Sequence, residues 1–185
     1  MNTLRRGRRK PRRPGPAALH GSPRLRTIHG GPMAGTLTFR YVTYLATTPE
    51  KVWHALTDPE LSGAYWGHGN VSDWRPGSRW EHRRTDGSGI ADVEGVVLES
   101  APPTRLVTTW AEPGAPTGRG EPGVSTVTFG IEPYEEIVRL TLTHEDLADE
   151  AEREAAAGGW FAVLANLKTL LETGRPLPKE PWTMP

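Results

Sequence analysis

A long run of strand-like segments followed by one amphipathic helix constrains the fold of this chain more than any other feature. Between residues 78 and 144, segments rich in branched and aromatic residues alternate with turn signals such as Asp86-Gly87 and Pro102-Pro103. Strands joined by such short connections pair with antiparallel neighbours. The sequence therefore predicts an antiparallel sheet that contains Ser78–Arg84, Ala91–Ser100, Leu106–Trp110, Val124–Ile131 and Ile137–His144.

The helix is predicted most strongly from Gly159 to Thr173, and Gly158-Gly159 should weaken it just before this stretch. Its apolar side repeats at i, i+4, i+7 and i+11, through Trp160, Leu164, Leu167 and Leu171. Gly174 is the expected C-terminal stop. Because a sheet with one buried face needs a cover, and no other helix is long enough, we expect the sheet to curve around this helix.

One further strand and two short helices are predicted before this sheet. The strand is Thr36–Leu45, and helix-start signals follow at Thr47-Thr48-Pro49-Glu50 and at Thr57-Asp58-Pro59-Glu60. The glycines and proline from Gly67 to Gly77 predict turns. The chain is therefore predicted to be α+β, with a curved antiparallel sheet of about six to seven strands around a long C-terminal helix and two short helices after the first strand.

Composition excludes several classes of protein. The absence of Cys excludes a disulfide scaffold, thiolate metal sites and a Cys nucleophile. No run approaches the ~18 apolar residues of a transmembrane helix. A hydrophobic content of 36% together with 21 Gly suits a single globular domain.

Charge divides the chain into two parts. Residues 1–33 hold nine Lys and Arg and no acid, whereas the rest holds 13 bases and all 22 acids, a net charge of −9. Residues 1–32 lack a hydrophobic period and are predicted to be disordered, either as an arginine-rich anion-binding segment or as sequence upstream of a start at Met33. No apolar stretch follows the arginines, so a secretory signal is not indicated and a cytoplasmic location is expected.

The folded domain is expected at residues 33–178, with a C-terminal tail at 179–185 that reads as loop. The acidic excess of this domain argues against a nucleic-acid partner.

The histidines lie apart, and the sequence carries no catalytic or metal-binding motif. No HExxH pattern or GxSxG elbow occurs, so we predict no metal, no cofactor and no catalytic serine of the α/β-hydrolase type. His82 is the one candidate for catalysis, because the two-residue strand period places it on the same face as Trp80. There its imidazole could orient a ligand's oxygen, carry a proton, or simply be satisfied by a neighbour.

Four tryptophans fall on the elements expected to enclose the space between sheet and helix, where they either line a cavity or fill it as ordinary core. Large aromatic rings offer both apolar area and an orienting N–H group. The predicted cavity is lined by Tyr41, Trp66, Trp80, His82, Trp110, Phe129, Leu142, Trp160 and Leu164.

Several local segments resemble one known superfamily over about residues 36–178. They are Thr48–Leu61, Trp66, Pro103–Val107, Thr109-Trp110, and the Gly159-Trp160 pair with Leu164, Leu167, Leu171, Glu172 and Gly174. The chain resembles the START-like, or SRPBCC, superfamily with its helix-grip fold, and especially the bacterial proteins related to the C-terminal domain of the activator of the ninety-kilodalton heat-shock protein's ATPase. The resemblance implies a deep apolar cavity between sheet and C-terminal helix.

The resemblance leaves the function open, since members carry lipids, bind hormones, cyclise polyketides or act as co-chaperones, and the branch shares no catalytic signature. Our first hypothesis is a non-catalytic binder of a small hydrophobic or aromatic molecule. The alternatives are an enzyme of the cyclase or dehydratase kind that uses His82, and a co-chaperone-like or regulatory protein with a protein partner or a homodimer.

Overall fold

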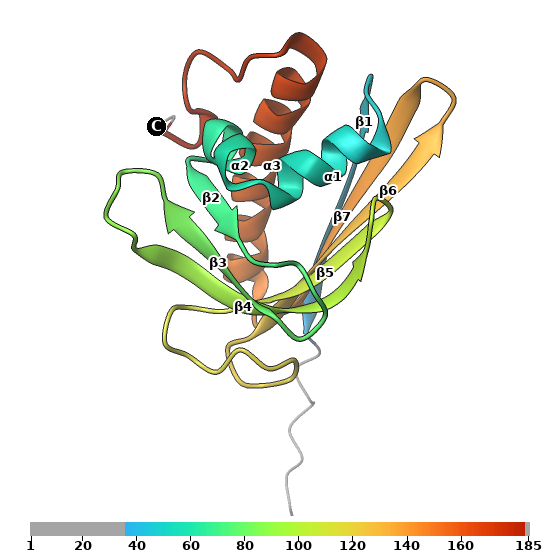
Figure 1. Ribbon diagram of the computed structural model, residues 1–185. Coiled ribbons are helices and arrows are strands. Elements are labelled where there is room, and N and C mark those ends of the chain that lie inside the picture. The colour runs from blue at the N-terminus through green and yellow to red at the C-terminus, as the bar shows by residue number, and fades with distance from the viewer. Residues whose placement is uncertain (1–35, 184–185) are drawn as a thin grey trace, which may run out of the picture. The chain divides into compact units, whose positions relative to one another are not determined.

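The structure, a computed structural model that describes residues 36–183, contains one antiparallel sheet of seven strands (Figure 1). Their order across the sheet is β1-β7-β6-β5-β4-β3-β2. The strands are β1 (Leu37–Leu45), β2 (His68–Val71), β3 (Arg79–Arg84), β4 (Ala91–Ala101), β5 (Arg105–Trp110), β6 (Ser125–Tyr134) and β7 (Ile137–Leu147). The predicted basic segment 1–32 and the start at Met33 lie outside the described residues.

Residues 36–183 also contain three α-helices and one short 3-10 helix: α1 (Pro49–Thr57), α2 (Pro59–Trp66), α3 (Glu150–Thr173) and η1 (Pro181–Thr183). The two short helices begin where the capping signals predict. Thr48 caps α1, and the Asp58 carboxylate accepts hydrogen bonds from the backbone N–H groups of Glu60 and Leu61, both at 2.9 Å, at the start of α2. Each helix begins with a proline, Pro49 or Pro59, which has no N–H that would need a partner at that position.

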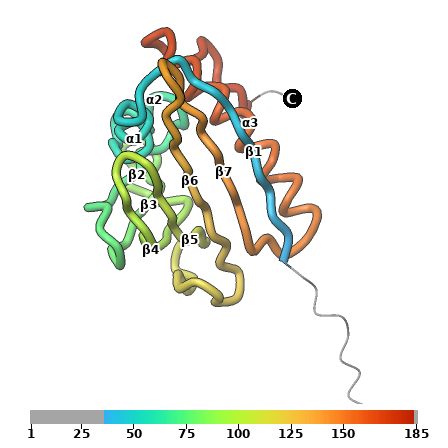
Figure 2. The backbone as a smooth tube through the Cα atoms, turned by 90° about the vertical axis from the view of Figure 1, so that its right-hand side faces the viewer, coloured from blue at the N-terminus to red at the C-terminus, as the bar shows by residue number. Residues whose placement is uncertain are grey.

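The sheet curves around α3, with α1 and α2 beside one end of this helix (Figure 1). In the second view, α3 runs alongside β1 (Figure 2). The buried core contains Leu45, Leu140 and Leu142 of the sheet together with Leu164 and Leu167 of α3. This arrangement confirms the predicted α+β class and the helix-grip fold.

Strand β2 is absent from the sequence prediction, which assigned turns to this region because of its glycines. It pairs with β3 and forms one edge of the sheet. A Cβ on Gly69 would stand only 3.0 Å from the carbonyl oxygen of Pro59. The glycine therefore allows β2 to pass close to the start of α2 rather than turning the chain.

Helix α3 begins nine residues earlier than the stretch that was predicted most strongly. The Asp149 side chain accepts a hydrogen bond from the backbone N–H of Glu152 at 2.9 Å, and the Glu152 carboxylate accepts one from the N–H of Ala148 at 2.6 Å. This reciprocal cap starts the helix, which then continues through Gly158 and Gly159. The C-terminal end agrees with the prediction, since Gly174 adopts a left-handed conformation there.

Two smaller differences concern connections. Strand β6 continues through Glu132, Pro133 and Tyr134, which were predicted to form a turn, and pairs with β7 as far as Tyr134. The C-terminal tail was predicted as loop, but it contains η1, and its Trp182 lies against Gly67 at the end of α2.

Candidate ligand-binding cavity

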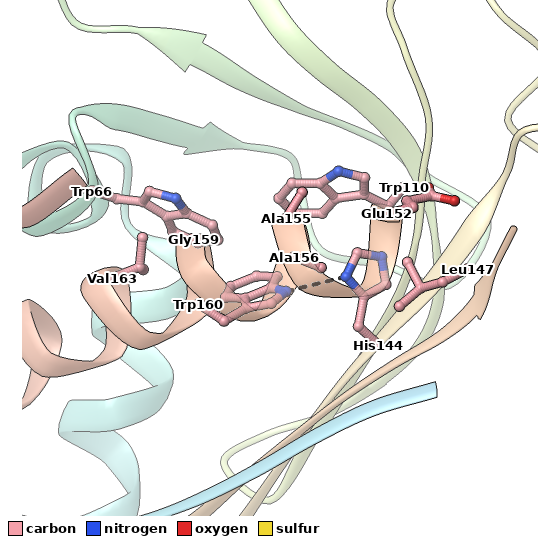
Figure 3. Close-up of a pocket in the computed structure, with 10 residues that line it drawn as sticks. All are labelled: Trp66, Trp110, His144, Leu147, Glu152, Ala155, Ala156, Gly159, Trp160 and Val163. Carbon is pink, nitrogen blue, oxygen red and sulfur yellow. Dashed lines mark hydrogen bonds between the residues drawn. The ribbon is translucent and has the colours of Figure 1, made fainter. Parts of the chain in front are cut away.

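An apolar cavity of about 260 Å³ lies between the sheet and the N-terminal half of α3 (Figure 3). It is lined by Trp66, Trp110, His144, Leu147, Glu152, Ala155, Ala156, Gly159, Trp160 and Val163. Three tryptophans from three different elements contribute to its wall: one from the end of α2, one from the end of β5 and one from α3. The fold thus brings together aromatic rings that are far apart in sequence.

The three rings contact one another directly. The ring centroid of Trp66 lies 5.2 Å from that of Trp160, and the centroid of Trp110 lies 5.5 Å from that of Trp160. Trp66 and Trp110 are nearly parallel, with an angle of 20° between their planes. Such offset and tilted arrangements are favourable for aromatic rings, and they give the cavity a rigid apolar wall.

Small residues on α3 leave open space among these rings. Ala155, Ala156 and Gly159 line the cavity, where larger side chains would occupy it. A Cβ on Gly159 would meet no atom within 4 Å. A glycine in a helix interior costs roughly 0.5–1 kcal/mol relative to alanine, so Gly159 lowers the stability of the helix at a position where it leaves open space in the cavity.

A second, more polar hollow of about 410 Å³ adjoins the first and shares Trp110 and Glu152 with it. Residues of segment 112–124, which connects β5 to β6, line it, and Asp92 and Glu112 are among its lining residues. A molecule held against Trp110 could therefore have an apolar part in the first cavity and a polar part in the second.

His144 lines the apolar cavity with both ring nitrogens already hydrogen-bonded. The Trp160 indole N–H donates to Nδ1 at 3.1 Å (Figure 3). Nε2 lies 2.8 Å from Oγ of Ser125. Because Nδ1 accepts, the single proton of the neutral ring is on Nε2 and donates to Ser125. Burial lowers the pKa of His144 to about 4, against the opposing effect of Asp146, so the ring is neutral at pH 7.

These contacts disfavour Ser125 and His144 as a nucleophile–base pair. A catalytic base must accept the serine proton through a free nitrogen lone pair. Here the nitrogen that faces Ser125 already carries the proton, and an indole N–H rather than a carboxylate binds the other nitrogen. The pair therefore links β6, β7 and α3 instead of activating the hydroxyl.

His82 lies beside the cavity on the concave side of the sheet. Its ring centroid is 4.4 Å from that of Trp66 and 5.9 Å from that of Trp110. Its Nδ1 is 2.7 Å from Oδ1 of Asn70. Burial, followed by the charge of the neighbouring His68, lowers the pKa of His82 to about 3, against the effect of Asp92.

A polar cluster lies on the outer side of His82. His68 stacks on His82 with 4.4 Å between ring centroids, and its Nε2 lies 2.8 Å from Oδ2 of Asp92. Arg84 donates to both oxygens of the same carboxylate. The hydrogen bond from Arg84, and then the one from His68, hold the pKa of Asp92 well below its usual range.

The structure brings most of the sequence-predicted site residues together, although not all of them line the cavity. Trp66, Trp110 and Trp160 line it. Trp80, His82 and Phe129 are buried next to these rings. The other three lie elsewhere: Leu142 and Leu164 belong to the packed core, and Tyr41 contacts Phe161 on α3 with ring centroids 5.3 Å apart.

The sequence reasoning missed His144 and the small residues of α3. The strand period gave one usable signal, since Leu142 was predicted to face inward and His144 follows two positions later on the same strand. The run from Ala155 to Gly159 gave another, because small residues on a buried helix side leave space. From the sequence, Gly158 and Gly159 were expected only to weaken the helix.

Two further observations concern the described residues alone. No three His, Asp or Glu side chains within 36–183 are grouped so that they could hold a metal ion. None of the helices in this part of the chain is long and apolar enough to cross a membrane.

Solved structures with the same fold include proteins from several bacteria. ChR145 from Cytophaga hutchinsonii is 28% identical, with 75% of this chain and 96% of that chain covered and a TM-score of 0.59. CV1439 from Chromobacterium violaceum is 28% identical, with 73% and 96% covered and a TM-score of 0.57. The Aha1 dimer from Colwellia psychrerythraea is 21% identical, with 75% and 98% covered and a TM-score of 0.59, and this likeness shows the fold alone.

A search of curated proteins finds no match. Residues 46–172, more than half of the chain, match the family described as Activator of Hsp90 ATPase homolog 1-like protein. This match and the helix-grip fold agree with the resemblance seen in the sequence. The chain belongs to the Activator of Hsp90 ATPase homolog 1-like family.

Proposed function

We propose that this protein binds a small hydrophobic or aromatic molecule, without catalysis, in the cavity between the sheet and α3. The observation that carries the proposal is that three tryptophan rings and three small residues of α3, Ala155, Ala156 and Gly159, line the same apolar space. Close-packed interiors leave few voids larger than a water molecule. Ligand sites are usually concave and lined mainly by hydrophobic and aromatic side chains, with a few polar groups.

The volume indicates the size of the ligand. An apolar cavity of ~150 Å³ binds benzene in another protein, so a cavity of about 260 Å³ suits a molecule of roughly two fused rings. The neighbouring hollow lined by segment 112–124 could hold a polar substituent. We therefore expect a flat aromatic body whose polar end reaches toward Trp110 and Glu152.

Native mass spectrometry of the full-length purified chain tests this proposal. We expect an added mass of a small molecule at one-to-one stoichiometry, which denaturing extraction releases. If the wild-type chain carries no added mass, the same measurement is repeated after incubation with 2-naphthol. The absence of a complex in both cases would contradict the proposal.

Two neighbouring glycines offer a matched pair of variants. Both Gly158 and Gly159 have open space around an added Cβ, but only Gly159 lines the cavity. Gly159→Leu should fill the cavity and abolish the complex, whereas Gly158→Leu should retain it. Equal loss of the complex in both variants would show that the helix itself, rather than the cavity, had been disturbed.

A second candidate function, contact with a second copy of the chain, has one specific observation in its favour. Strand β1 forms an edge of the sheet, and its Tyr44 is 53% exposed. Phe161 of α3 is 50% exposed and packs against Tyr41 of the same strand. An edge strand flanked by exposed aromatic rings can pair with another chain.

Light scattering after size exclusion tests this candidate over a range of concentrations. The candidate is supported if the wild-type chain is a dimer and Val42→Lys, on the outer face of β1, is a monomer. A monomer at every concentration would exclude it.

A further inference from the structure

We infer that a hollow beside η1 is a second binding site, which takes a primary ammonium group that donates a hydrogen bond to Nδ1 of His68. The ligand class is therefore an organic amine with a small apolar body. Among its lining residues, the hollow shares only Trp66 with the apolar cavity. The inference goes beyond the proposed function and does not depend on it.

The hollow has a volume of about 310 Å³ and lies where three parts of the chain meet. These parts are the end of α2 with the start of β2, the region of β3 and β4 around their connection, and the C-terminal segment that contains η1. The side chains that matter for binding are two indole rings and five ionisable groups, which belong to Trp66, Trp182, His68, Arg84, Asp86, Asp92 and Glu180.

Asp92 determines which nitrogen of His68 carries the proton. Nε2 of His68 lies 2.8 Å from Oδ2 of Asp92, and Arg84 donates to both oxygens of the same carboxylate. The hydrogen bond from Arg84, and then the one from His68, keep the pKa of Asp92 well below its usual range. An ionised carboxylate only accepts, so Nε2 donates to it, and in the neutral ring Nδ1 has a free lone pair.

This lone pair is a buried acceptor in the wall of the hollow. Nδ1 of His68 is buried and makes no hydrogen bond to any residue in 36–183. One face of the ring stacks on His82, with ring centroids 4.4 Å apart, so the opposite face and the edge that carries Nδ1 remain to line the hollow. A buried acceptor without a partner costs free energy, which a donor on a ligand would recover.

The charges around the hollow favour a cation over an anion. Arg84 is the one Lys or Arg side chain that lines it, and its guanidinium is bound to Asp92. The carboxylates of Asp86 and Glu180 form no ion pair within the described part of the chain. An anionic ligand would therefore meet two negative charges without a free basic group, whereas an ammonium group would be attracted by both.

The two indole rings favour an organic ammonium over a metal ion. The face of a tryptophan ring attracts cations, and Trp66 and Trp182 both line the hollow. No three His, Asp or Glu side chains between residues 36 and 183 are grouped to hold a metal ion. A primary ammonium group has three donors, so one can bind His68 while the others face the carboxylates or water.

Calorimetric titration of the full-length protein at pH 8 tests the inference with four compounds that share a phenylethyl body. They are phenethylamine, its N,N,N-trimethyl derivative, 2-phenylethanol and 3-phenylpropionate. We expect phenethylamine to bind about tenfold more tightly than the trimethyl derivative, which cannot donate, and than the alcohol, which has no charge. Phenylpropionate should not bind. Equal affinity of the amine and either of the first two controls, or no binding of the amine, would overturn the inference.

Three variants locate the site. Glu180→Gln should weaken phenethylamine binding about threefold, whereas Glu136→Gln, which removes a charge in the turn between β6 and β7, should not. Gly159→Leu fills the apolar cavity and should leave the affinity for the amine unchanged. Loss of amine binding in Gly159→Leu would show that the amine occupies the apolar cavity, which overturns this inference and leaves the proposed function in place.

Nitrogen NMR of the His68 ring tests the hydrogen bond itself. At pH 8, where an ordinary imidazole is neutral and an alkylamine is charged, we expect the proton on Nε2. The Nδ1 resonance should shift when phenethylamine binds and stay in place with the trimethyl derivative. A proton on Nδ1 in the free protein, or an Nδ1 resonance that phenethylamine does not shift, would overturn the inference.

Discussion

The indole N–H of Trp160 donates to Nδ1 of His144 at 3.1 Å and thereby joins α3 to β7 at the cavity wall. The bond requires the imidazole to be neutral at Nδ1. A protonated His144 would present a second N–H to the indole, and both groups would then lack an acceptor. The ligand cavity and the protonation state of this histidine are therefore linked.

Trp160→Phe removes this donor while keeping an aromatic ring. We expect it to destabilise the protein by about 1–3 kcal/mol, from the lost hydrogen bond and the smaller ring. The pKa of His144 should rise from about 4 toward its ordinary value, because the open site admits water. NMR titration of the His144 ring measures this pKa directly. An unchanged pKa would contradict the link between the cavity wall and the protonation state of His144.

Stability should fall as the pH drops below neutrality. The folded-state pKa values of about 3 for His82 and about 4 for His144 lie below the unfolded value of 6.5. Below pH 6.5 the unfolded chain therefore binds protons that the folded protein does not, and the stability present above this pH is lost progressively down to pH 4 and 3.

Between pH 6 and pH 5, each of these histidines should contribute a slope of up to about 1.4 kcal/mol per pH unit. Urea unfolding at several pH values measures it, and His82→Gln should reduce the slope. A flat profile over this range would show that the buried rings can be protonated in the folded state.

Gly95 of β4 allows the Trp80 indole to reach its acceptor. The Trp80 N–H donates to the carbonyl oxygen of Thr109 at 2.9 Å, and a Cβ on Gly95 would lie 2.1 Å from that oxygen and 2.3 Å from the indole nitrogen. Gly95→Ala should therefore destabilise the protein by on the order of 4 kcal/mol. Gly158→Ala is the control and should instead stabilise by roughly 0.5–1 kcal/mol.

Asn166 connects α3 to the segments on either side of it. It is only 2% exposed, its Nδ2 donates to the carbonyl oxygen of Tyr65 at 2.7 Å, and its Oδ1 accepts from the N–H of Leu177 at 2.6 Å. Asn166→Ala leaves both backbone groups without this partner and should cost about 2–4 kcal/mol. Thermal unfolding measures the loss, and Thr169→Ala should have little effect, because the Thr169 hydroxyl bonds only to the Ala165 carbonyl oxygen of its own helix.

Local signals predicted the architecture well because they act over a few residues. The Thr-Pro-Glu and Asp-Pro-Glu signals gave the starts of α1 and α2, and the alternation from Ile137 onward gave β7. The start of α3 was missed, although Asp149 and Glu152 form a capping pair. The glycines at 158 and 159 outweighed this pair in the prediction, whereas in the fold the packing of α3 on the sheet maintains the helix.

The polar partners at the site depend on distances that the sequence does not contain. Asn70 and His82 are opposite one another only because β2 pairs with β3, and β2 was predicted as turns. Likewise, Trp160 meets His144 only through the packing of α3 against β7. The sequence predicted that the tryptophans lie around the space between the sheet and the helix, because of the elements on which they fall. The open space between their rings depends on Gly159 and its small neighbours.

NMR of the indole N–H groups during titration with 2-naphthol tests the central claim most directly, because the tryptophans report from different places. We predict that the signals of Trp66, Trp110 and Trp160 shift, while that of Trp53, which lies outside the cavity, does not. The shifts should disappear in Gly159→Leu and persist in Gly158→Leu. Unchanged signals from the three cavity tryptophans, or the same response in both glycine variants, would contradict the account.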